Sequence, residues 1–346
     1  MNIPNPGNSG EFLNTITFPE LYDIVDKNFT TLRELVPEVA EQLFIVEDAK
    51  IPSPNMVRYD EYDVDTFAAR KPEAQGTIAR SFGIGYSVTA VPLRFGKKAV
   101  VTKEDRLHGK DREVSNSFVS LSSVVAQRKE LDLTHVITFC TATSYTNMEG
   151  ETITTSVGDG LALASAVHKL KHSATTYSNR ASGDPLFAPG SADVMEGMTK
   201  NQIMNNFGER RVINFNVIFC ADTPSVYKAI KRHYGSSSDD TQNNSGVMNV
   251  DMGKYKLVVL PYLATSATGA YDSTKKNWWG MISTSAGSTG NRWQAYIRYW
   301  ERPYLVSPEE GNTKNGDNDT WEFHTRGYYS IRVVSPRGFL ISCPTS

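Results

Sequence analysis

The stretch "REVSNSFVSLSSVVAQRKELDLTHVITF", residues 112–139, predicts one helix of unusual length. Its apolar residues recur at steps of four, three and four, which places them on one face of an α-helix: Val114, Phe118, Leu121 and Val125. No glycine or proline interrupts the pattern. A helix of about 25 residues would span ~38 Å at 1.5 Å per residue, which is long for a globular protein. We therefore expect a single continuous helix over 111–139.

Two segments in which apolar and polar residues alternate precede this helix. The stretches "MVRYDEYDVDTFA" (56–68) and "ARSFGIGYSVTAVPLRFGKKAVVT" (79–102) have the period of β-strands, and the second changes phase near Val91. The turn-rich tip "RKPEAQGT" (70–77) joins them, so 56–102 is predicted to form one long hairpin. The glycines of "FGIGYS" lie within the strand pattern and favour a bend or close packing. Because an isolated two-stranded ribbon is marginally stable in water, we expect a neighbouring molecule to hold it.

Three further segments are predicted to be helices: "TFPELYDIVDKNFTTLREL" (17–35), "PEVAEQLF" (37–44) and "SADVMEGMTKNQIMNNFGE" (191–209). In the last of them, Val194, Met198 and Ile203 are expected to point inward. The first two are short and amphipathic, so they need other elements to pack against.

The C-terminal half combines an α/β unit with a long strand. The apolar strands "RVINFNVIFC" (211–220) and "KYKLVVLPYL" (254–263) flank the helix "DTPSVYKAIKRHYG" (222–235), and this order predicts an α/β unit. Residues 321–333 place Trp321, Phe323, Tyr329, Ile331 and Val333 on one parity and mostly polar residues on the other, and they predict a strand longer than most. The chain is therefore expected to have a mixed, α+β fold.

The charge balance and the cysteine count limit the classes of function. The 346 residues include 36 basic and 38 acidic ones, for a formal net charge of −2, so no overall basic field indicates nucleic-acid binding. Three scattered cysteines are too few for a disulfide framework and fit a reducing compartment. The opening "MNIPNPGNSGEF" lacks the pattern of a signal peptide, and no apolar run reaches the ~18 residues that a membrane span requires. We expect a soluble, intracellular product that contacts no membrane.

The sequence contains no recognised catalytic or cofactor-binding motif: it has no Walker A loop, G-x-S-x-G elbow or dinucleotide fingerprint. The stretch "DGLALASAVHKLKHSATTYSNR" (159–180) holds the best metal candidates, His168 and His172, which would share one face of a helix. A zinc site needs three or four ligands, so histidines at the surface or at an interface are the favoured interpretation. Cys140, Cys220 and Cys343 have no motif of a catalytic thiol around them and are interpreted as small hydrophobic residues. No catalytic, cofactor-binding or metal site is predicted.

Tryptophans in the C-terminal half point to an alternative function. Trp278, Trp279 and Trp300 could stack on sugars or bases. Their surroundings, "KKNWWGMIS" and "YIRYWERPYLV", have strand patterns, so a place in the core or in a subunit contact is favoured. Two alternatives from other classes stay open: a carbohydrate-binding β-rich protein, and a hydrolase that uses His168 and His172.

The order of the predicted segments is more specific than any single motif. An arm, a long hairpin, a long helix ending in "AQRKELDLTHVI", the small-residue stretch 159–180, an α/β unit, the segment "YDSTKKNWW" and the terminal strand "WEFHTRGYYSIRVVSPRGFLIS" follow one another. This order resembles the major capsid protein of tailed bacteriophages, which has the Hong-Kong-97-type (Johnson) fold. Within that family the sequence looks closest to the Mu-like branch. The resemblance covers the chain from about residue 50 to its end.

The resemblance implies a division of the α+β chain in the manner of that family. The implied parts are an N-terminal arm at 1–55, an E-loop hairpin at 56–102, a peripheral domain at 103–189 with a spine helix at 111–139 and a β-excursion, an axial domain at 190–300, and a C-terminal return strand of the peripheral domain at 301–346.

The resemblance also implies a structural, non-enzymatic function. Copies of the chain would self-assemble as hexamers and pentamers into an icosahedral shell that encloses the phage double-stranded DNA and contacts it non-specifically. Implied partners are a portal, a decoration protein and, because no scaffolding extension precedes the arm, a separate scaffolding protein. Assembly would take place in the host cytoplasm and the product would be part of the virion. An encapsulin-like nanocompartment shares this fold and is the closest alternative.

Four charged residues around the hairpin tip are expected to contact a neighbouring subunit: Arg70, Lys71, Glu73 and Arg80. Some relatives join their subunits by a Lys–Asn isopeptide bond. Lys71, Lys97 and Lys98 lie in or near the hairpin, but no glutamate can be assigned as the catalyst, so this cross-link is not part of the expectation.

Overall fold

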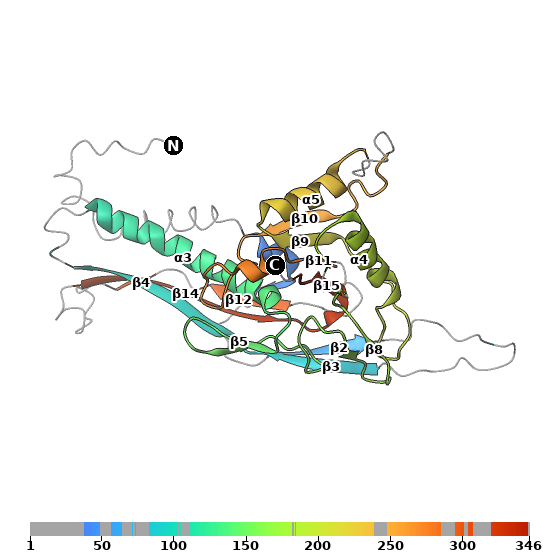
Figure 1. Cartoon of the computed structure of the whole chain (residues 1–346). Coiled ribbons are helices and arrows are strands. Elements are labelled where there is room, and N and C mark those ends of the chain that lie inside the picture. Colours follow the sequence, from blue (N-terminus) through green and yellow to red (C-terminus); the bar gives the residue numbers. More distant parts are fainter. Residues whose placement is uncertain are drawn as a thin grey trace.

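The long helix is present as predicted. In the computed structural model, α3 runs without a break over Asp111–Thr138, alongside the two long strands β4 (Leu93–Thr102) and β14 (Thr320–Arg332) (Figure 1). The predicted helix over 17–35 lies outside the described residues. The structure describes residues 38–48, 57–63, 71, 73, 83–102, 104, 111–181, 183, 185–238, 248–284, 295–300, 304–306 and 320–344.

Strand β14 is the centre of a five-stranded sheet. It pairs antiparallel with β4 along one edge, and with β12 and β13 along the other edge. Strand β1 continues the sheet by pairing in parallel with β12. The bounds of these smaller strands are Val46–Asp48 (β1), Ala295–Trp300 (β12) and Tyr304–Val306 (β13). The predicted strand over 321–333 is thus confirmed, and its inward side chains Phe323, Tyr329 and Val333 are buried.

Aromatic and charged side chains fix α3 against this sheet. The ring of Phe95 stacks on that of Tyr329 at a centroid distance of 4.2 Å, and the Arg128 guanidinium lies 5.3 Å from the Phe95 centroid. The Tyr329 hydroxyl donates a 2.6 Å hydrogen bond to Asp132, which also accepts one from Arg128 at 2.8 Å. Arg128 and Asp132 of the "RKELD" segment therefore form a polar contact with the sheet.

A second sheet has four strands in the order β10–β9–β11–β15. Helix α5 connects β9 to β10, and these two strands pair in parallel. Strand β11 lies between β9 and β15 and is antiparallel to both. This confirms the predicted α/β unit, although β9 begins at Val217 and not at residue 211. The bounds are Pro189–Asn201 (α4), Val217–Ala221 (β9), Pro224–Gly235 (α5), Lys256–Leu260 (β10), Trp279–Ile282 (β11) and Phe339–Ser342 (β15).

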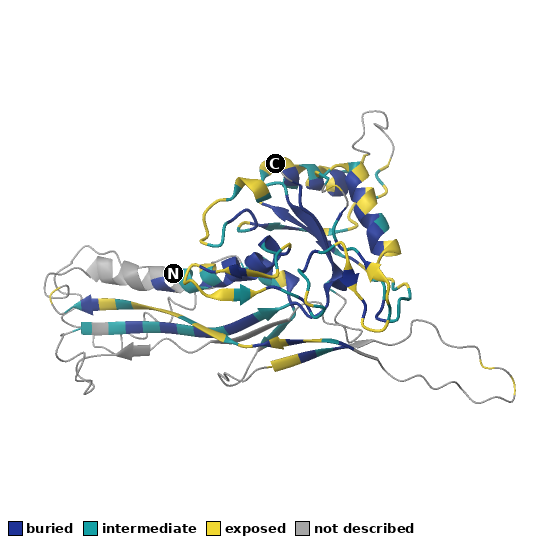
Figure 2. Cartoon of the chain, turned by 60° about the horizontal axis from the view of Figure 1, so that its bottom comes forward, coloured by how far each residue is buried: buried dark blue, intermediate teal, exposed yellow. Residues whose placement is uncertain are grey.

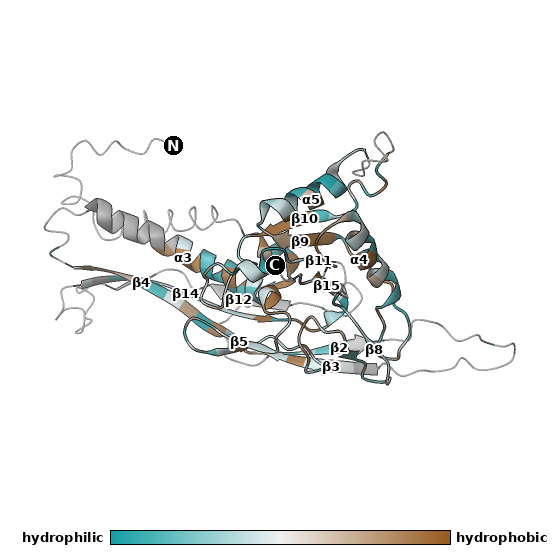
Figure 3. Cartoon of the chain, in the orientation of Figure 1, coloured by the Kyte–Doolittle hydropathy of each residue, from teal (hydrophilic) through white to brown (hydrophobic). Residues whose placement is uncertain are grey.

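The two faces of this sheet bury different layers. On β9, Ile218 and Cys220 belong to a core that includes α4 and α5 residues. Val217, Phe219 and Ala221 belong to a core that includes the C-terminal half of α3 and part of β14. Figure 2 shows buried residues concentrated in this sheet, and Figure 3 shows the hydrophobic residues of β9 and β10. The sheet therefore packs on one face against α4 and α5 and on the other face against α3 and β14.

The remaining regular elements are short. Three two-stranded ribbons pair β2 with β3, β5 with β6, and β7 with β8. A 3-10 helix, η1, replaces the predicted helix over 37–44, and η6 precedes β15. The bounds are Ala40–Leu43 (η1), Val57–Asp63 (β2), Gly83–Ala90 (β3), Ser144–Thr146 (β5), Thr152–Thr154 (β6), His168–Lys169 (β7), Thr176–Tyr177 (β8), Ser273–Lys275 (η3) and Pro336–Gly338 (η6).

The predicted hairpin over 56–102 is corrected by the strand pairing. Strand β2 pairs with β3, but the chain after Pro92 continues as β4 and pairs with β14 instead. Proline has no backbone N–H to donate to a sheet, and the change of phase near Val91 falls at this break. The hairpin therefore returns only as far as Ala90, and residues 93–102 belong to the five-stranded sheet.

Two other expectations change in detail. The side chain of Val194 is 51% exposed and does not point inward, because the buried stripe of α4 follows Ala192, Met195 and Met198 instead. The sheets also cross the boundary predicted at residue 300. Strand β12 lies in the five-stranded sheet with β14, and β15 lies in the four-stranded sheet with β9 and β11.

Candidate functional site: an anchored hairpin

The β2–β3 hairpin is a separate ribbon whose root is attached to the body of the protein. Its pairing extends from Val57↔Ala90 to Asp63↔Gly83, and among the described residues it joins no further strand. Tyr59 and Ala90 pack against Val334, which follows β14. The Tyr59 hydroxyl also donates a 2.9 Å hydrogen bond to Glu47. Among the described residues, apolar packing at the root thus includes this cluster of three side chains and the buried Val88.

A buried ion pair provides the main polar anchor of the ribbon. Glu61 of β2 accepts from Arg337 of η6, and the two residues are 2% and 4% exposed. Asn206 donates to Glu61 at 3.0 Å and accepts from Arg337 at 3.0 Å, which closes a ring of three side chains. Arg337 also donates to the Met204 carbonyl oxygen at 2.6 Å. The anchor thus joins the hairpin to the segment after α4 and to the C-terminal turn.

Gly85 makes room for this anchor. A Cβ atom at this position would lie 2.6 Å from Glu61 Oε2 and 2.6 Å from Asn206 Nδ2. Both atoms belong to buried side chains whose hydrogen bonds fix them, so they cannot move away freely. The close packing expected for the "FGIGYS" glycines is therefore confirmed at Gly85.

The small-residue stretch 159–180 lies beside the hairpin. A Cβ atom on Gly158 would lie 2.5 Å from the Tyr86 Cβ atom, and Lys171 Nζ is 5.1 Å from the Tyr86 ring centroid. The Lys171 backbone N–H donates to Asn206 at 3.3 Å, so the stretch also contacts the anchor. Burial, followed by the charges of Asp159 and Glu61, raises the pKa of Tyr86.

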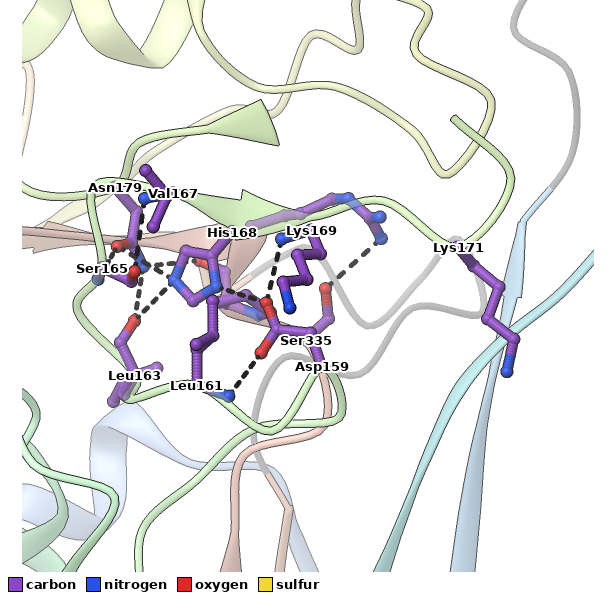
Figure 4. A network of polar contacts seen from close by, with 12 residues as sticks. Asp159, Leu161, Leu163, Ser165, Val167, His168, Lys169, Lys171, Asn179 and Ser335 are labelled. Atoms are coloured by element: carbon purple, nitrogen blue, oxygen red, sulfur yellow. Dashed lines mark hydrogen bonds and ion pairs between the residues drawn. The ribbon is translucent and has the colours of Figure 1, made fainter. Parts of the chain in front are cut away.

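His168 organises this stretch from within. Its Nδ1 lies 2.8 Å from Asp159 Oδ2, and its Nε2 lies 3.2 Å from both the Leu163 carbonyl oxygen and Asn179 Oδ1 (Figure 4). Burial is the largest single influence on the Asp159 carboxyl and raises its pKa, but the contact with His168 and the backbone N–H groups of Leu161 and Lys169 together lower the pKa below its usual value. His168 is fully buried, so the expectation of a surface or interface histidine is wrong for this residue.

The two histidines of this stretch do not converge. His168 stacks on Tyr177, whereas the exposed His172 stacks on Phe207 at a centroid distance of 5.1 Å. The four-residue spacing would place both on one face of a helix, but His168 begins strand β7. Within the described part of the chain, no three His, Cys, Asp or Glu residues are grouped as metal ligands.

The cysteines and tryptophans have structural environments. Burial raises the pKa of the Cys140 thiol well above its usual value and that of Cys220 to about 12, so neither thiol is activated as a thiolate nucleophile. Trp278 and Trp279 are buried, and Trp279 Nε1 donates to the Pro185 carbonyl oxygen at 3.2 Å. Their expected place in the core is confirmed, and they form no exposed stacking surface for sugars.

A cavity of about 200 Å³ lies between the five-stranded sheet, α3 and the β5–β6 ribbon. Phe95, Val136, Tyr145 and Tyr329 are among its lining residues. Small-molecule sites typically measure ~300–1,000 Å³, so this cavity is smaller than a typical substrate pocket. Among the described helices, none is long and apolar enough to cross a membrane.

Of the four residues predicted at the hairpin tip, Lys71 and Glu73 are exposed. Arg70 and Arg80 lie outside the described residues, so the expected interface stays a prediction. The site residues expected from the sequence did not include Glu61, Asn206 and Arg337. One signal was available, because Glu61 shares the strand parity of the buried Tyr59, and a carboxylate on a buried strand face needs a buried partner.

Comparison with known proteins gives similarity only at the level of structure. No protein-family model matches the chain, and no curated protein matches it. The mature capsid of bacteriophage PhiM1 is similar with a TM-score of 0.47 and 13% identity, covering 86% of this chain and 83% of that one. The capsid of cyanophage P-SCSP1u has a TM-score of 0.46 and 12% identity, covering 86% and 85%.

A virus-like particle from Pyrococcus furiosus is also similar. Its TM-score is 0.49 at 10% identity, and the match covers 93% of this chain and 99% of that one. The similar solved structures are mostly bacteriophage capsid proteins, the family that the sequence resembles.

Proposed function

We propose that this chain is the major capsid protein of a tailed bacteriophage, with a Hong-Kong-97-type fold. The observation that carries the proposal is a two-stranded ribbon whose root is fixed by the buried Glu61–Arg337–Asn206 ring. A ribbon of two strands gains little stability of its own in water. Rigid attachment at the root is therefore best explained if the ribbon has to present its outer part to another molecule in a defined direction.

The partner that this arrangement fits is another copy of the chain. We place the hairpin tip, with Arg70, Lys71, Glu73 and Arg80, across a neighbouring subunit. Each exposed charge pair there would contribute only ~0–1 kcal/mol. Symmetry repeats the same contact at every interface of a closed shell, so the sum becomes large. The near-neutral net charge of −2 also limits repulsion between many identical copies.

The parts of the chain then take the following roles. Residues 1–55 are the arm, β2–β3 is the E-loop, and α3 is the spine helix of the peripheral domain. The five-stranded sheet belongs to the peripheral domain and includes β12, which moves residues 295–300 out of the axial domain. The four-stranded sheet with α4 and α5 forms the axial domain, which β15 completes from the C-terminal segment.

In this proposal the protein is structural and not an enzyme. Its copies form hexamers and pentamers of an icosahedral shell, assembled in the host cytoplasm, around double-stranded DNA that they contact non-specifically. A portal, a scaffolding protein and a decoration protein are the further partners. The raised pKa values of Cys140 and Cys220 support this interpretation, because they leave no activated thiol at these two positions.

The test is assembly of the purified protein, followed by sedimentation and negative-stain microscopy. We expect closed particles for the parent chain. Deletion of residues 71–77 should leave a folded subunit with near-normal thermal unfolding that forms no closed particles. A matched control, Lys171→Ala, alters a charged residue near the hairpin root and should still assemble. Particles of parental size and stability from the deletion variant would contradict the role of the hairpin.

The same experiment separates the alternative functions. Cages that neither package nor protect nucleic acid when produced with the phage packaging proteins would favour an encapsulin-like compartment. A monomer that binds sugars would favour a carbohydrate-binding protein, and a monomer with hydrolytic activity lost in His168→Ala would favour a hydrolase. Either monomeric outcome would contradict the capsid proposal.

A further inference from the structure

Two consecutive charged residues of α3 are buried where the chain segment 38–44 crosses the helix. Lys129 is 0% exposed and Glu130 is 1% exposed. The Lys129 ammonium forms ion pairs with Glu38 and, at 2.6 Å, with Glu41. Leu43 of η1 is buried in the core between this segment and α3. The segment is therefore attached to the helix by both apolar packing and buried charge, and we call residues 38–44 the crossing segment.

Glu130 holds the crossing segment through its backbone. Oε1 accepts hydrogen bonds from the N–H groups of Val39, at 3.1 Å, and Ala40, at 2.6 Å. The other oxygen, Oε2, is buried, and no described residue lies within hydrogen-bond distance of it. In this position one oxygen of the carboxylate accepts two hydrogen bonds, and the other is buried without a partner among the described residues. Ionisation of Glu130 therefore costs free energy that a neutral carboxyl does not.

The surrounding charges do not remove this cost. Burial is the largest influence on Glu130 and raises its pKa to about 7, against the opposing effects of the two N–H groups and Lys129. Glu38 raises it further, and Lys129 is already shared between Glu38 and Glu41. On the same helix, Arg128 and Asp132 pair with each other and contact Glu149 and Tyr329. His135 stays neutral above about pH 4, because burial and then Lys275 lower its pKa.

We propose that Glu130 is a pH-sensitive latch, which holds the crossing segment against α3 when its carboxyl is protonated and loosens the segment when the carboxyl ionises. The direction follows from linkage. The pKa of Glu130 is higher in the folded chain than in the unfolded chain, so its contribution to stability is fully present at low pH and is lost as the pH rises through about 7. The latch acts within one subunit, so it does not depend on the proposed assembly.

Hydrogen exchange of the full-length, unassembled chain tests the latch directly. The amides of Val39 and Ala40 exchange only when the crossing segment opens. After correction for the intrinsic rate, we expect their opening constant to be roughly tenfold larger at pH 8 than at pH 6, as for one group that titrates near 7. Glu130→Gln retains an oxygen for both N–H groups but carries no charge. Its opening constant should lie below the parent value already at pH 6, because the parent carboxyl is ionised in the opened state at that pH, and it should not change between pH 6 and pH 8.

The control variant is Glu149→Gln, which removes a carboxylate that pairs with Arg128 outside the latch. It should keep the tenfold pH dependence at Val39 and Ala40. A carbon-13 titration of the parent chain gives a second measurement that needs no variant, and the Glu130 carboxyl should titrate near pH 7. A pH dependence that survives in Glu130→Gln, or a parent chain with less than a twofold change, would overturn the latch.

Discussion

The four-stranded sheet and the β2–β3 hairpin are stabilised by different kinds of interaction. Every residue of β9 and β15 is buried, and both faces of the sheet pack against apolar layers. The hairpin instead has a small apolar cluster and one ring of three polar side chains at its root. Stabilisation of the sheet is spread over many contacts, whereas that of the hairpin depends on a few residues. Substitutions at the hairpin anchor should therefore release the hairpin and leave the sheet folded.

The largest effect is expected from Arg337→Met. This substitution leaves the Glu61 carboxylate buried without its cationic partner, and breaking a buried pair in this way typically costs ~3–5 kcal/mol. Amide exchange should accelerate along β2 and β3 far more than along β9. Equal acceleration in both regions would show that the anchor stabilises the whole chain and not the hairpin alone.

A double variant sharpens this result. In Glu61→Gln combined with Arg337→Met no charge is buried, and the introduced glutamine side chain can still accept from Asn206. Its hairpin should therefore be more stable than that of Arg337→Met alone, because replacing a buried ion pair is far less costly than breaking it. A double variant that is as unstable as the single one would mean that lost packing, and not the unpaired charge, causes the defect.

A glycine in the sheet provides the reverse test. A Cβ atom on Gly280 of β11 would overlap the Leu340 carbonyl oxygen and lie 2.5 Å from the Phe219 ring. Because backbone of β15 would have to move, Gly280→Ala should cost about 3 kcal/mol, at the upper end of overpacking. The loss should appear in global unfolding by denaturant. If amide hydrogen exchange in the β2–β3 hairpin changed while the free energy of global unfolding stayed the same, the expected role of Gly280 in the sheet would be contradicted.

The matched glycine of the hairpin should have a smaller effect. In Gly85→Ala the atoms nearest to the new methyl group belong to the side chains of Glu61 and Asn206, each at 2.6 Å. Side chains can shift more easily than a paired backbone, so we expect a cost of ~1–2 kcal/mol. The effect should be confined to β2 and β3. Native-state amide hydrogen exchange, measured for Gly85→Ala and for Gly280→Ala, shows whether the two effects differ in this way.

The periodicity of apolar residues was sufficient to predict those helices and strands that a single continuous stretch of sequence defines. Helix α3 and strand β14 were predicted because their apolar residues keep one period over many residues. The pairing of β4 with β14 was missed because it joins residues far apart in the chain, such as Lys98 and Glu322, which are 224 positions apart. A strand pattern records which face is buried but not which strand lies next to it.

The anchor could not have been derived for the same reason. Glu61 and Arg337 are 276 positions apart, and Arg337 lies in the short turn η6 without a period of its own. The parity of Glu61 indicated a buried carboxylate, but any arginine or lysine could have been its partner. For His168, the helical spacing of "HKLKH" was misleading, because the segment forms a short strand with Asp159 and Asn179 around the ring.

The smallest effect is expected from Arg58→Ala, which removes the second ion pair of β2. Arg58 Nε lies 2.7 Å from Asp60 Oδ1, with the arginine side chain 64% exposed. Water screens this pair, and exposed pairs contribute ~0–1 kcal/mol. The pair lies on the same strand as Glu61, but it is exposed and joins two residues of β2, whereas Glu61 pairs with Arg337 of η6. Amide exchange in the hairpin close to that of the parent would show that the buried pair to the body, and not the exposed pair within β2, anchors the ribbon. Acceleration comparable to Arg337→Met would instead mean that the outer surface of β2 is also part of the anchor.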